Sequence, residues 1–364
     1  MNNGLMPDTL DRIFKSYTVE ASAPCRIDMG GTLDISTMFY PLRRFDPCTF
    51  NAAINLRTRV RLLPYLSNVV KVSSRGFESA EYPLKKAPFD HPLGLMFAIA
   101  AYFGADGIHI DIESSSPPRS ALGGSSAAAV ALVAAFLTAF DKAPGQTSAF
   151  RHQTAMLAHS IEASVAGVPC GRQDQLAAVF GGVNAWYWSG EIPGNCYRKK
   201  TIFPPGAFDY LEQRLLLAYC GIPHESSQIN HQWIRQFLSG TTRDLWEEIV
   251  KCTHLFVESL CRRDIQTACE AMNREMAIRK QMTPDVLDDI GERLVNSAVR
   301  LNCGARITGA GGGGCLWALG QPDDISRLRG VWADMLTKRS DARLLDVTLD
   351  SDGLTSALLP VKDR

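Results

Sequence analysis

The spacing of apolar and polar residues along the chain predicts alternating strands and helices. Residues 108–112 place Ile108, Ile110 and Ile112 on one face, a pattern typical of a strand buried on one side. A run of small and apolar residues, 126–140, then predicts a buried helix. Similar patterns predict strands over 19–23, 49–55, 58–63, 69–73, 215–219, 305–308, 315–319 and 342–349, and helices over 93–103, 148–166, 228–302 (with loops near 240 and 282–284) and 323–338.

Prolines and glycines concentrate between the two halves of the chain, over residues 188–206. Such residues interrupt regular structure, so we expect a domain boundary there. The expected domains are residues 1–195 and 196–364. Strands and helices are mixed in both, which favours an α+β fold for the second domain.

The composition is that of a globular protein without a strongly charged surface. Hydrophobic residues make up 46% of the 364 residues, and the formal net charge is zero. A neutral chain with no basic tract gives no reason to expect a nucleic-acid or membrane-surface partner. We therefore expect a small-molecule partner, and the sequence leaves monomer and homodimer open.

The cysteines and the N-terminus favour a cytoplasmic location. The ten cysteines are scattered without a C-x-x-C pair, which argues against a disulfide framework or structural zinc. The first residues lack a basic segment followed by an apolar core, so we expect no signal peptide. The longest apolar run is shorter than the roughly 20 residues of a spanning helix.

The most distinctive stretch is a Gly/Ser-rich loop between the strand 108–112 and the helix that follows. Free N–H groups and the helix dipole at such a helix start favour phosphate binding. The alternative is an ordinary turn with Ser126 as the N-cap. The loop lacks the Gly-Lys-Ser/Thr of a Walker A motif and the spacing of a dinucleotide fingerprint.

Three segments of the chain resemble, in order, the motifs of the GHMP small-molecule kinases, which include galactokinases, homoserine kinases and mevalonate kinases. These segments are residues 23–34 (APCRIDMGGTLD), 117–127 (PPRSALGGSSA) and 306–315 (RITGAGGGGC). A fourth, residues 171–175 (GRQDQ), is similar to the sugar-kinase branch, notably heptose-phosphate and fucose kinases. The resemblance implies a two-domain α+β fold, with a ribosomal-S5-like first domain and a ferredoxin-like second domain. It also implies Mg²⁺ and ATP, with a sugar or sugar phosphate as acceptor.

By this resemblance, Asp174 is the base that accepts the proton of the acceptor hydroxyl, and Arg26 lies near the transferred phosphate. Phosphoryl transfer depends on positioning and on charge stabilisation, so a carboxylate and a cation suit these roles. From the residues alone, the alternative is that Asp174 caps a helix that starts at Gln175.

The resemblance assigns the nucleotide to the central and C-terminal loops. The implied contacts are Pro118, Ser120, Ala121, Leu122, Gly123, Gly124, Ser125, Ser126, Thr308, Gly309, Ala310 and Gly311. Glu162 interrupts an apolar helix face and matches the acidic Mg²⁺ ligand of the family, with Ser125 as its partner and Ser126 as the alternative. Carboxylate and hydroxyl oxygens are suitable ligands for Mg²⁺.

The resemblance assigns the acceptor to Asp34, with Asp28 as a second candidate because this loop is shorter than in relatives, and to Gly312. The plain alternative for the acidic residues is a solvated Arg–Asp pair. His224, Ser226 and Ser227 are weaker acceptor candidates, competing with a simple capped turn.

For some residues two interpretations stay open, and others depart from the family pattern. Arg279 and Lys280 form either a solvated basic face or a site for a substrate phosphate. Leu95, Ile99 and Tyr102 share one helix face, which we expect to be core. Two positions usually occupied by Gly hold Arg119 and Ala121, and one often occupied by Lys holds Arg306.

Three other functions compete with a sugar kinase. A dehydrogenase is disfavoured because a strand, not a helix, follows the loop 309–314. A non-catalytic sugar and ATP sensor would not need Arg26, Glu162 and Asp174. A mevalonate-pathway enzyme is disfavoured by the segment 171–175.

Overall fold

The computed structural model describes residues 10, 12–141, 147–167, 169–190, 196–223 and 226–361, and the side chains of residues 141 and 226–228 are not among those described. The strands are β1 (Tyr17–Met29), β2 (Cys48–Pro64), β3 (Val69–Ser74), β4 (Ala80–Pro83), β5 (Ile108–Ser114), β6 (Val183–Trp188), β7 (Tyr197–Phe203), β8 (Leu215–Tyr219), β9 (Gly304–Ile307), β10 (Cys315–Leu319), β11 (Arg343–Leu345) and β12 (Thr355–Pro360). The α-helices are α2 (Ser36–Phe39), α3 (Gly94–Tyr102), α4 (Gly124–Asp141), α5 (Ser148–Val165), α6 (Gln173–Phe180), α7 (Phe208–Glu212), α8 (Ser226–Leu238), α9 (Arg243–Cys261), α10 (Ile265–Met282), α11 (Asp289–Arg300) and α12 (Pro322–Leu336).

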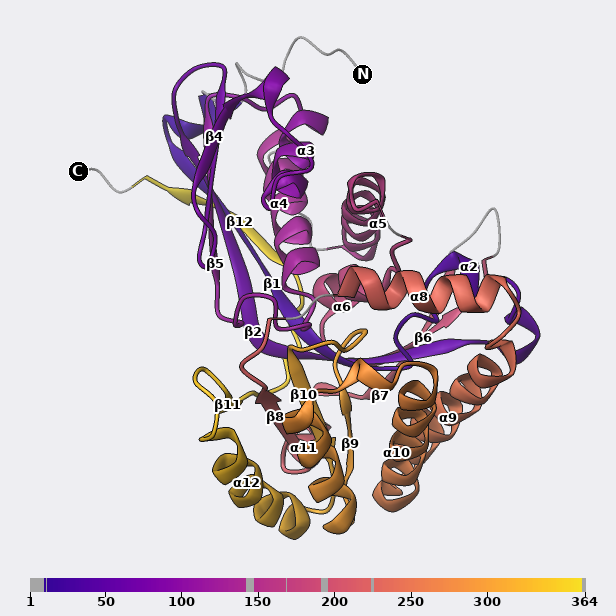
Figure 1. Ribbon diagram of the computed structural model, residues 1–364. Coiled ribbons are helices and arrows are strands. Elements are labelled where there is room, and N and C mark those ends of the chain that lie inside the picture. The colour runs from indigo at the N-terminus through magenta and orange to yellow at the C-terminus, as the bar shows by residue number, and fades with distance from the viewer. Residues whose placement is uncertain are drawn as a thin grey trace.

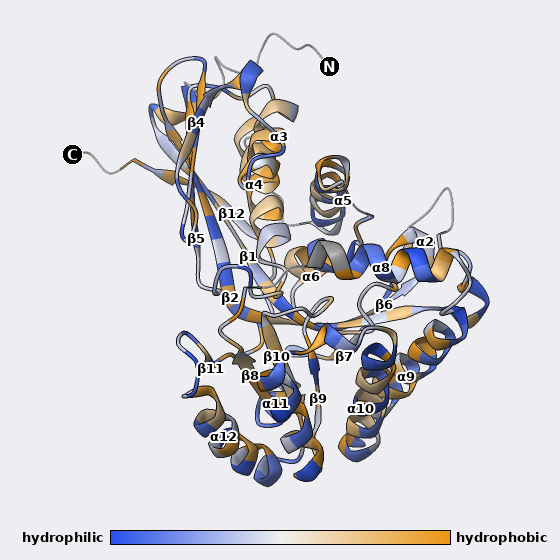
Figure 2. Ribbon diagram, in the orientation of Figure 1, coloured by the Kyte–Doolittle hydropathy of each residue, from blue (hydrophilic) through white to orange (hydrophobic). Residues whose placement is uncertain are grey.

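The N-terminal half is organised on a large sheet. Six of its strands follow the order β12-β1-β2-β5-β3-β4, and β6 pairs with β2 and β7 beside this path. All these pairs are antiparallel except β3 with β5. Helices α3, α4 and α5 lie along one side of the sheet (Figure 1), and α4 packs on β1 and β2. Few hydrophilic residues interrupt α4 (Figure 2), as expected for a helix buried all round.

The C-terminal half is built on a small antiparallel sheet in the order β11-β8-β10-β9. Helices α11 and α12 pack on this sheet, and both mix hydrophilic and hydrophobic residues (Figure 2), as expected for helices with one solvated face. Helix α10 packs on β9, and α9 packs on α10 and on β2. The pair α9–α10 therefore connects the two sheets.

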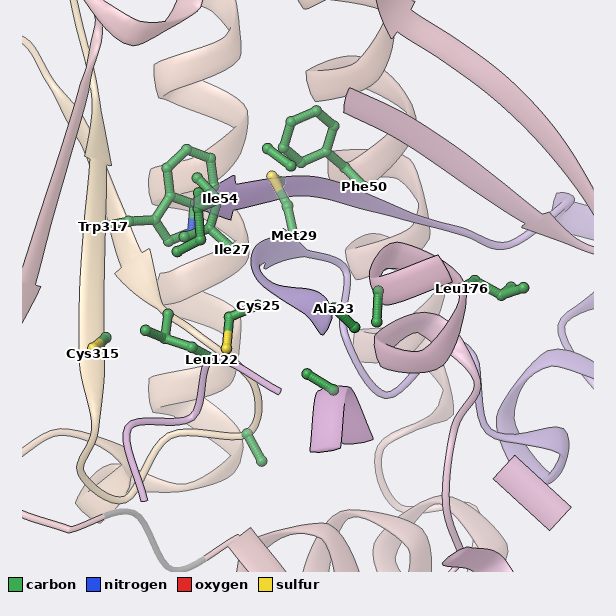
Figure 3. Close-up of a cluster of buried hydrophobic side chains, with 14 of the residues drawn as sticks. Ala23, Cys25, Ile27, Met29, Phe50, Ile54, Leu122, Leu176, Cys315 and Trp317 are labelled. Atoms are coloured by element: carbon green, nitrogen blue, oxygen red, sulfur yellow. The ribbon is translucent and has the colours of Figure 1, made fainter. Parts of the chain in front are cut away.

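One apolar cluster joins the two halves (Figure 3). Trp317 of β10 stacks on Phe50 of β2, with ring centroids 6.3 Å apart, and Phe256 of α9 meets both rings edge-on. Each of the three side chains is at most 1% exposed. Burial of an aromatic side chain stabilises a fold by roughly 1.5–3 kcal/mol, so this cluster contributes strongly to the contact between the sheets.

Most predicted elements are confirmed, with four corrections, the first being that only residues 343–345 of the strand predicted over 342–349 form a strand, β11. Residues 26–29 belong to β1 and not to a loop, and β2 is one continuous strand. Two strands that follow the predicted boundary, β7 and β12, pair into the large sheet. The division at residue 195 stays a prediction. Within the described ranges, no helix combines the length and the apolar character that crossing a bilayer requires.

Candidate active site

A pocket of about 440 Å³ lies where the central loop, α5, α6 and the C-terminal glycine loop meet. Part of its lining is apolar, with Phe77, Leu93, Met96 and Ile112. The lining also carries polar side chains. Those that the sequence singled out are Arg26, Asp34, Arg119, Ser120, Ser125, Ser126, Glu162 and Asp174. The lining thus combines apolar side chains, suited to a planar apolar group, with polar side chains, suited to hydroxyl and phosphate groups.

The central loop presents the start of α4 to this pocket. Gly123, Gly124, Ser125 and Ser126 all line it, and α4 begins at Gly124. An 18-residue helix directs its free N–H groups and the positive end of its dipole toward this space. The predicted order of strand, loop and helix N-terminus is therefore confirmed.

The backbone of the central loop explains why glycine is expected at two of its positions. Arg119 and Ala121 have φ angles of 52° and 62°, in the left-handed region that glycine adopts most easily. Arg119 is exposed at the pocket. Leu122 is fully buried, so it anchors the loop and does not line the pocket. The remaining loop residues, Pro118, Ser120 and Ala121, all line it.

Asp174 lies in the first turn of α6 and faces the pocket. Nε and Nη2 of Arg26 both lie 2.8 Å from its Oδ1. The other carboxylate oxygen lies beside Gly123, where a Cβ would come within 3.2 Å of it. Burial raises the pKa of Asp174, and the charge of Arg26 opposes that rise. Because α6 begins at Gln173 and its N-cap is Arg172, Asp174 is not an N-cap.

Asp34 lies on the same side of the pocket and is 3% exposed. Its Oδ2 accepts a hydrogen bond from the backbone N of Gln173 at 3.0 Å. A Cβ on Gly171 would overlap the same carboxylate, so only glycine fits there. Burial raises the pKa of Asp34 to about 6. The acidic loop and the segment 171–175, distant in sequence, thus form one surface.

Glu162 meets the start of α4 through Ser126. The Oγ of Ser126 donates to Glu162 Oε2 at 2.9 Å, and Gln175 Nε2 donates to the same oxygen at 2.6 Å. Burial raises the pKa of Glu162 to about 7, and the bond from Ser126 opposes that rise. Ser125 is exposed at the pocket. Of the two serines, Ser126 is the one in contact with the acidic residue.

The C-terminal glycine loop reaches the pocket only through Gly309 and Ala310. Gly311 and Gly312 face Val286, whose backbone O accepts a bond from Gly312 N at 3.0 Å. Thr308 is fully buried, and its Oγ donates to the backbone O of Cys315. Thr308, Gly311 and Gly312 therefore stabilise the loop and do not line the pocket. Their contacts with a ligand stay predictions.

The same loop packs closely on the central loop. Cys315 N donates to Ser120 O at 2.9 Å, and a Cβ on Gly314 would come within 2.7 Å of that oxygen. The close approach predicted from the successive glycines is confirmed for the contact with the N-terminal half. It brings Gly309 to the edge of the pocket.

Two expectations about charged residues are wrong. Arg279 is fully buried and pairs with Glu275, so it is neither on a solvated face nor at the pocket. Lys280 is partly exposed, pairs with Glu292 at 2.7 Å and does not line the pocket, so for this residue the solvated alternative agrees with the structure. Asp28 is not solvated either: it is fully buried behind the pocket wall.

The sequence missed several polar residues of the pocket. Gln173 lines it and accepts a bond from Asn51 Nδ2 at 3.0 Å. Asn230 of α8 lines it from the C-terminal half, and Thr32 lines it beside Asp34. The sequence signal for this part of the pocket was the pair of amides, Gln173 and Gln175, on either side of Asp174. His224 lies outside the described residues, and only the backbone of Ser226 and Ser227 is described.

The prediction that one face of α3 belongs to the core is only partly correct. Ile99 of α3 is buried as expected, but Leu95 lines the pocket and Tyr102 is 61% exposed. The helix face that looked like core is therefore divided among core, pocket and solvent.

Two family models match the chain. The model of the GHMP kinases N-terminal domain matches residues 91–182, which include the central loop, Glu162 and Asp174. The model of the GHMP kinases C-terminal region matches residues 256–338, which include α10 and the glycine loop.

The chain is also similar to individual kinases. It is 24% identical to D-glycero-alpha-D-manno-heptose 7-phosphate kinase of Campylobacter jejuni, over 84% of this chain and 90% of that protein. It is 23% identical to the bifunctional fucokinase/GDP-fucose pyrophosphorylase of Arabidopsis thaliana, over 84% of this chain and 30% of that protein. The structure of Lactococcus lactis galactokinase complexed with galactose superposes with a TM-score of 0.70 at 17% identity, covering 93% of this chain and 95% of that chain. This likeness confirms the two-domain α+β fold.

Proposed function

The chain belongs to the GHMP kinase family, and we propose that it transfers the γ-phosphate of ATP to a hydroxyl group of a sugar or a sugar phosphate. The observation that supports this most is that one pocket is lined by a carboxylate paired with an arginine, by a helix N-terminus, and by a serine–glutamate pair. These are the groups that phosphoryl transfer needs: a proton acceptor, an anion site and a cation site.

In the proposed reaction, Asp174 orients the acceptor hydroxyl and takes its proton. The hydroxyl oxygen forms a bond to the γ-phosphorus, and the bond from that phosphorus to the bridging oxygen of ADP breaks. Arg26 holds Oδ1 of Asp174, which keeps the carboxylate turned toward Gly123 and the start of α4. General-base assistance of this kind is worth about 10²–10⁴-fold in rate.

The start of α4 suits the phosphate groups of the nucleotide. Its N–H groups and dipole favour an anion there, and Gly123 and Gly124 let the anion approach the backbone. The apolar side chains of the lining, among them Phe77 and Met96, suit the adenine ring.

Ser126 and Glu162 are the residues that would hold Mg²⁺. Ser126 thus takes the role that the sequence analysis assigned first to Ser125. Ser126 and Glu162 supply a hydroxyl and a carboxylate oxygen, the ligand types that Mg²⁺ accepts together with water and phosphate. Among the described residues no group of three or more His, Cys, Asp or Glu side chains forms a metal cage, which fits a cation held largely by its phosphates. When bound, Mg²⁺ supplies charge neutralisation at the phosphates.

The acceptor side favours a polyhydroxylated molecule. Asp34, Gln173 and Asn230 offer carboxylate and amide groups from three elements, and such groups bind hydroxyls. The heptose-phosphate kinase and fucokinase relatives support a sugar or a sugar phosphate.

The test is ADP release with Mg²⁺-ATP over a panel of acceptors. The panel holds mannose, fucose, galactose, heptoses, heptose 7-phosphate and mevalonate, and product mass identifies the transferred group. We expect turnover with one sugar or sugar-phosphate class. Turnover with mevalonate alone would contradict the sugar assignment, and binding of sugar and ATP without turnover would favour a sensor.

A further inference from the structure

We infer that Arg306, a residue of the C-terminal half, is a positioning residue for the transfer: by holding Asp28 it fixes Arg26, and through Arg26 the carboxylate of Asp174. This inference rests on the proposed function, because it takes Asp174 as the base. The four residues form a continuous series of ion pairs that begins in the pocket lining, at Asp174 and Arg26, and continues behind it.

The first link lies in β1, whose residues Arg26 and Asp28 are two apart and so point to the same face of the strand. Nη1 of Arg26 lies 3.4 Å from Oδ1 of Asp28 and donates to Ala121 O at 2.7 Å. Its Nε and Nη2 are then directed to Asp174. The guanidinium is therefore held on one edge by Asp28 and the central loop, and this leaves the other edge for the base.

Asp28 is the point where the two halves of the chain meet. Its Oδ1 accepts a bond from Gly309 N at 2.8 Å, and its Oδ2 lies 3.2 Å from Nη1 of Arg306. The same Nη1 also donates to the backbone O of Asp28. Arg306 thus fixes both the side chain and the backbone of Asp28, and with them the edge of the glycine loop.

Arg306 is itself held by two hydrogen bonds to the carboxylate of Glu275. Its Nε and Nη2 donate to Glu275 Oε2 and Oε1 at 3.1 and 3.3 Å. A planar guanidinium can bind two carboxylates along different edges, whereas a lysine ammonium acts as a point charge. Both Arg306 and Glu275 are fully buried, so neither can exchange its partner for water.

Arg279 completes the series on α10. Its Nε donates to Glu275 Oε1 at 2.5 Å and its Nη2 to Gly31 O at 2.8 Å. The guanidinium lies 4.8 Å from the ring of Trp233 and 5.4 Å from that of Trp246. Helix α10 therefore also fixes the loop that carries Asp34.

The signs of charge alternate along the whole series and cancel. The six members, in order, are Asp174, Arg26, Asp28, Arg306, Glu275 and Arg279. Burial alone would raise the pKa of Asp28, but Arg26 and Arg306 lower it, so this carboxylate stays charged. Without Arg306, Asp28 and Glu275 would each lose one of two arginine partners, and Asp28, left with Arg26 alone, would pull Arg26 away from Asp174.

The test compares Arg306→Met and Arg306→Lys with a control at Arg57. Arg57 also pairs with a carboxylate, Asp350, and donates to two backbone carbonyls, but it does not line the pocket. Steady-state kinetics on the wild type's best acceptor and thermal unfolding are measured for each variant. We expect Arg306→Met and Arg57→Met both to unfold at lower temperature. Only Arg306→Met should lose kcat, by about 10- to 100-fold, as a catalytic group displaced by about 1 Å does, with KM for ATP within about threefold of wild type.

Arg306→Lys should recover part of kcat because lysine restores the charge but cannot bind Glu275 and Asp28 along two edges of a planar group. Glu275→Gln, which is isosteric, serves if Arg306→Met does not fold, and it should lower kcat in the same direction. Wild-type kcat in Arg306→Met or in Glu275→Gln, or an equal loss in Arg57→Met, would overturn the inference. Asp174→Asn is assayed alongside: full activity there would instead overturn the proposed base.

Discussion

The Oγ of Ser126 lies 2.9 Å from Oε2 of Glu162, which joins the first turn of α4 to the last turn of α5. The contact places a hydroxyl and a carboxylate next to a helix N-terminus that favours anions. The proposed sites for an anion and for a cation would therefore lie next to each other, the arrangement that a Mg²⁺-nucleotide needs.

We predict that Ser126→Ala raises the Mg²⁺ concentration needed for half-maximal activity by about tenfold, since a hydrogen bond to a charged group is worth about 1.5–3 kcal/mol. Titration of Mg²⁺ at fixed ATP measures this. Ser125→Ala should shift the titration by less than about twofold, as surface substitutions do. The reverse ranking of the two variants would assign the cation to Ser125.

Gly171→Ala should damage acceptor binding without affecting the nucleotide. The new methyl group would overlap the Asp34 carboxylate and displace the acidic loop. We expect KM for the acceptor to rise by about tenfold or more, the loss of roughly one hydrogen bond to a charged group. ATP affinity, measured by calorimetry, should stay within twofold, on the order of RT.

The matched control is Gly330→Ala on α12. A Cβ there meets no atom within 4 Å, and the residue is exposed. Alanine is the better helix former by about 1 kcal/mol, so this variant should be slightly more stable and fully active. A normal acceptor KM in Gly171→Ala would contradict the assignment of Asp34.

Asp34→Asn should make the protein more stable at neutral pH. In the folded protein, burial raises the pKa of Asp34 from 3.8 to about 6. The folded state then binds the proton more tightly than the unfolded chain, so stability falls as pH rises from about 4 to 6. The difference corresponds to on the order of 3 kcal/mol above pH 6.

Denaturant unfolding of both proteins at pH 4 and pH 7 measures this effect. The gain from Asp34→Asn should be present at pH 7 and nearly absent at pH 4. Asp346→Asn, at an exposed carboxylate, should change stability by less than about 0.5 kcal/mol at either pH. A stability gain that is equal at both pH values would show that burial does not raise the pKa of Asp34.

The sequence predicted the central features of the fold because they depend on local patterns. The alternating residues of β5, the apolar helix α4 and the loop between them are all visible in consecutive residues. The close approach of Gly314 to Ser120 also followed from the run of glycines. Strand β12 was missed because its pairing with β1 depends on residues more than 300 positions away.

The polar residues of the site were predicted less completely for the same reason. Asp174 was identified by its motif and Glu162 as a charged residue in an apolar helix that matches the acidic ligand of the family, and both line the pocket. The choice between Ser125 and Ser126 depends on which of two consecutive residues faces α5, and one extra glycine changes that register on a helix. Arg279 was misread because a charged residue is usually solvated, and its partner Glu275 was not recognised.

The most direct test of the proposed kinase is the comparison of wild type with Asp174→Asn on whichever acceptor turns over. Both proteins are first shown to bind Mg²⁺-ATP equally by calorimetry, and phosphorylated product is then followed by mass. We predict that the variant binds ATP normally and loses about 10²–10⁴-fold in kcat, as expected when a general base is removed. Equal product formation by the two proteins would contradict the account, because the pocket's central carboxylate would then have no part in the transfer.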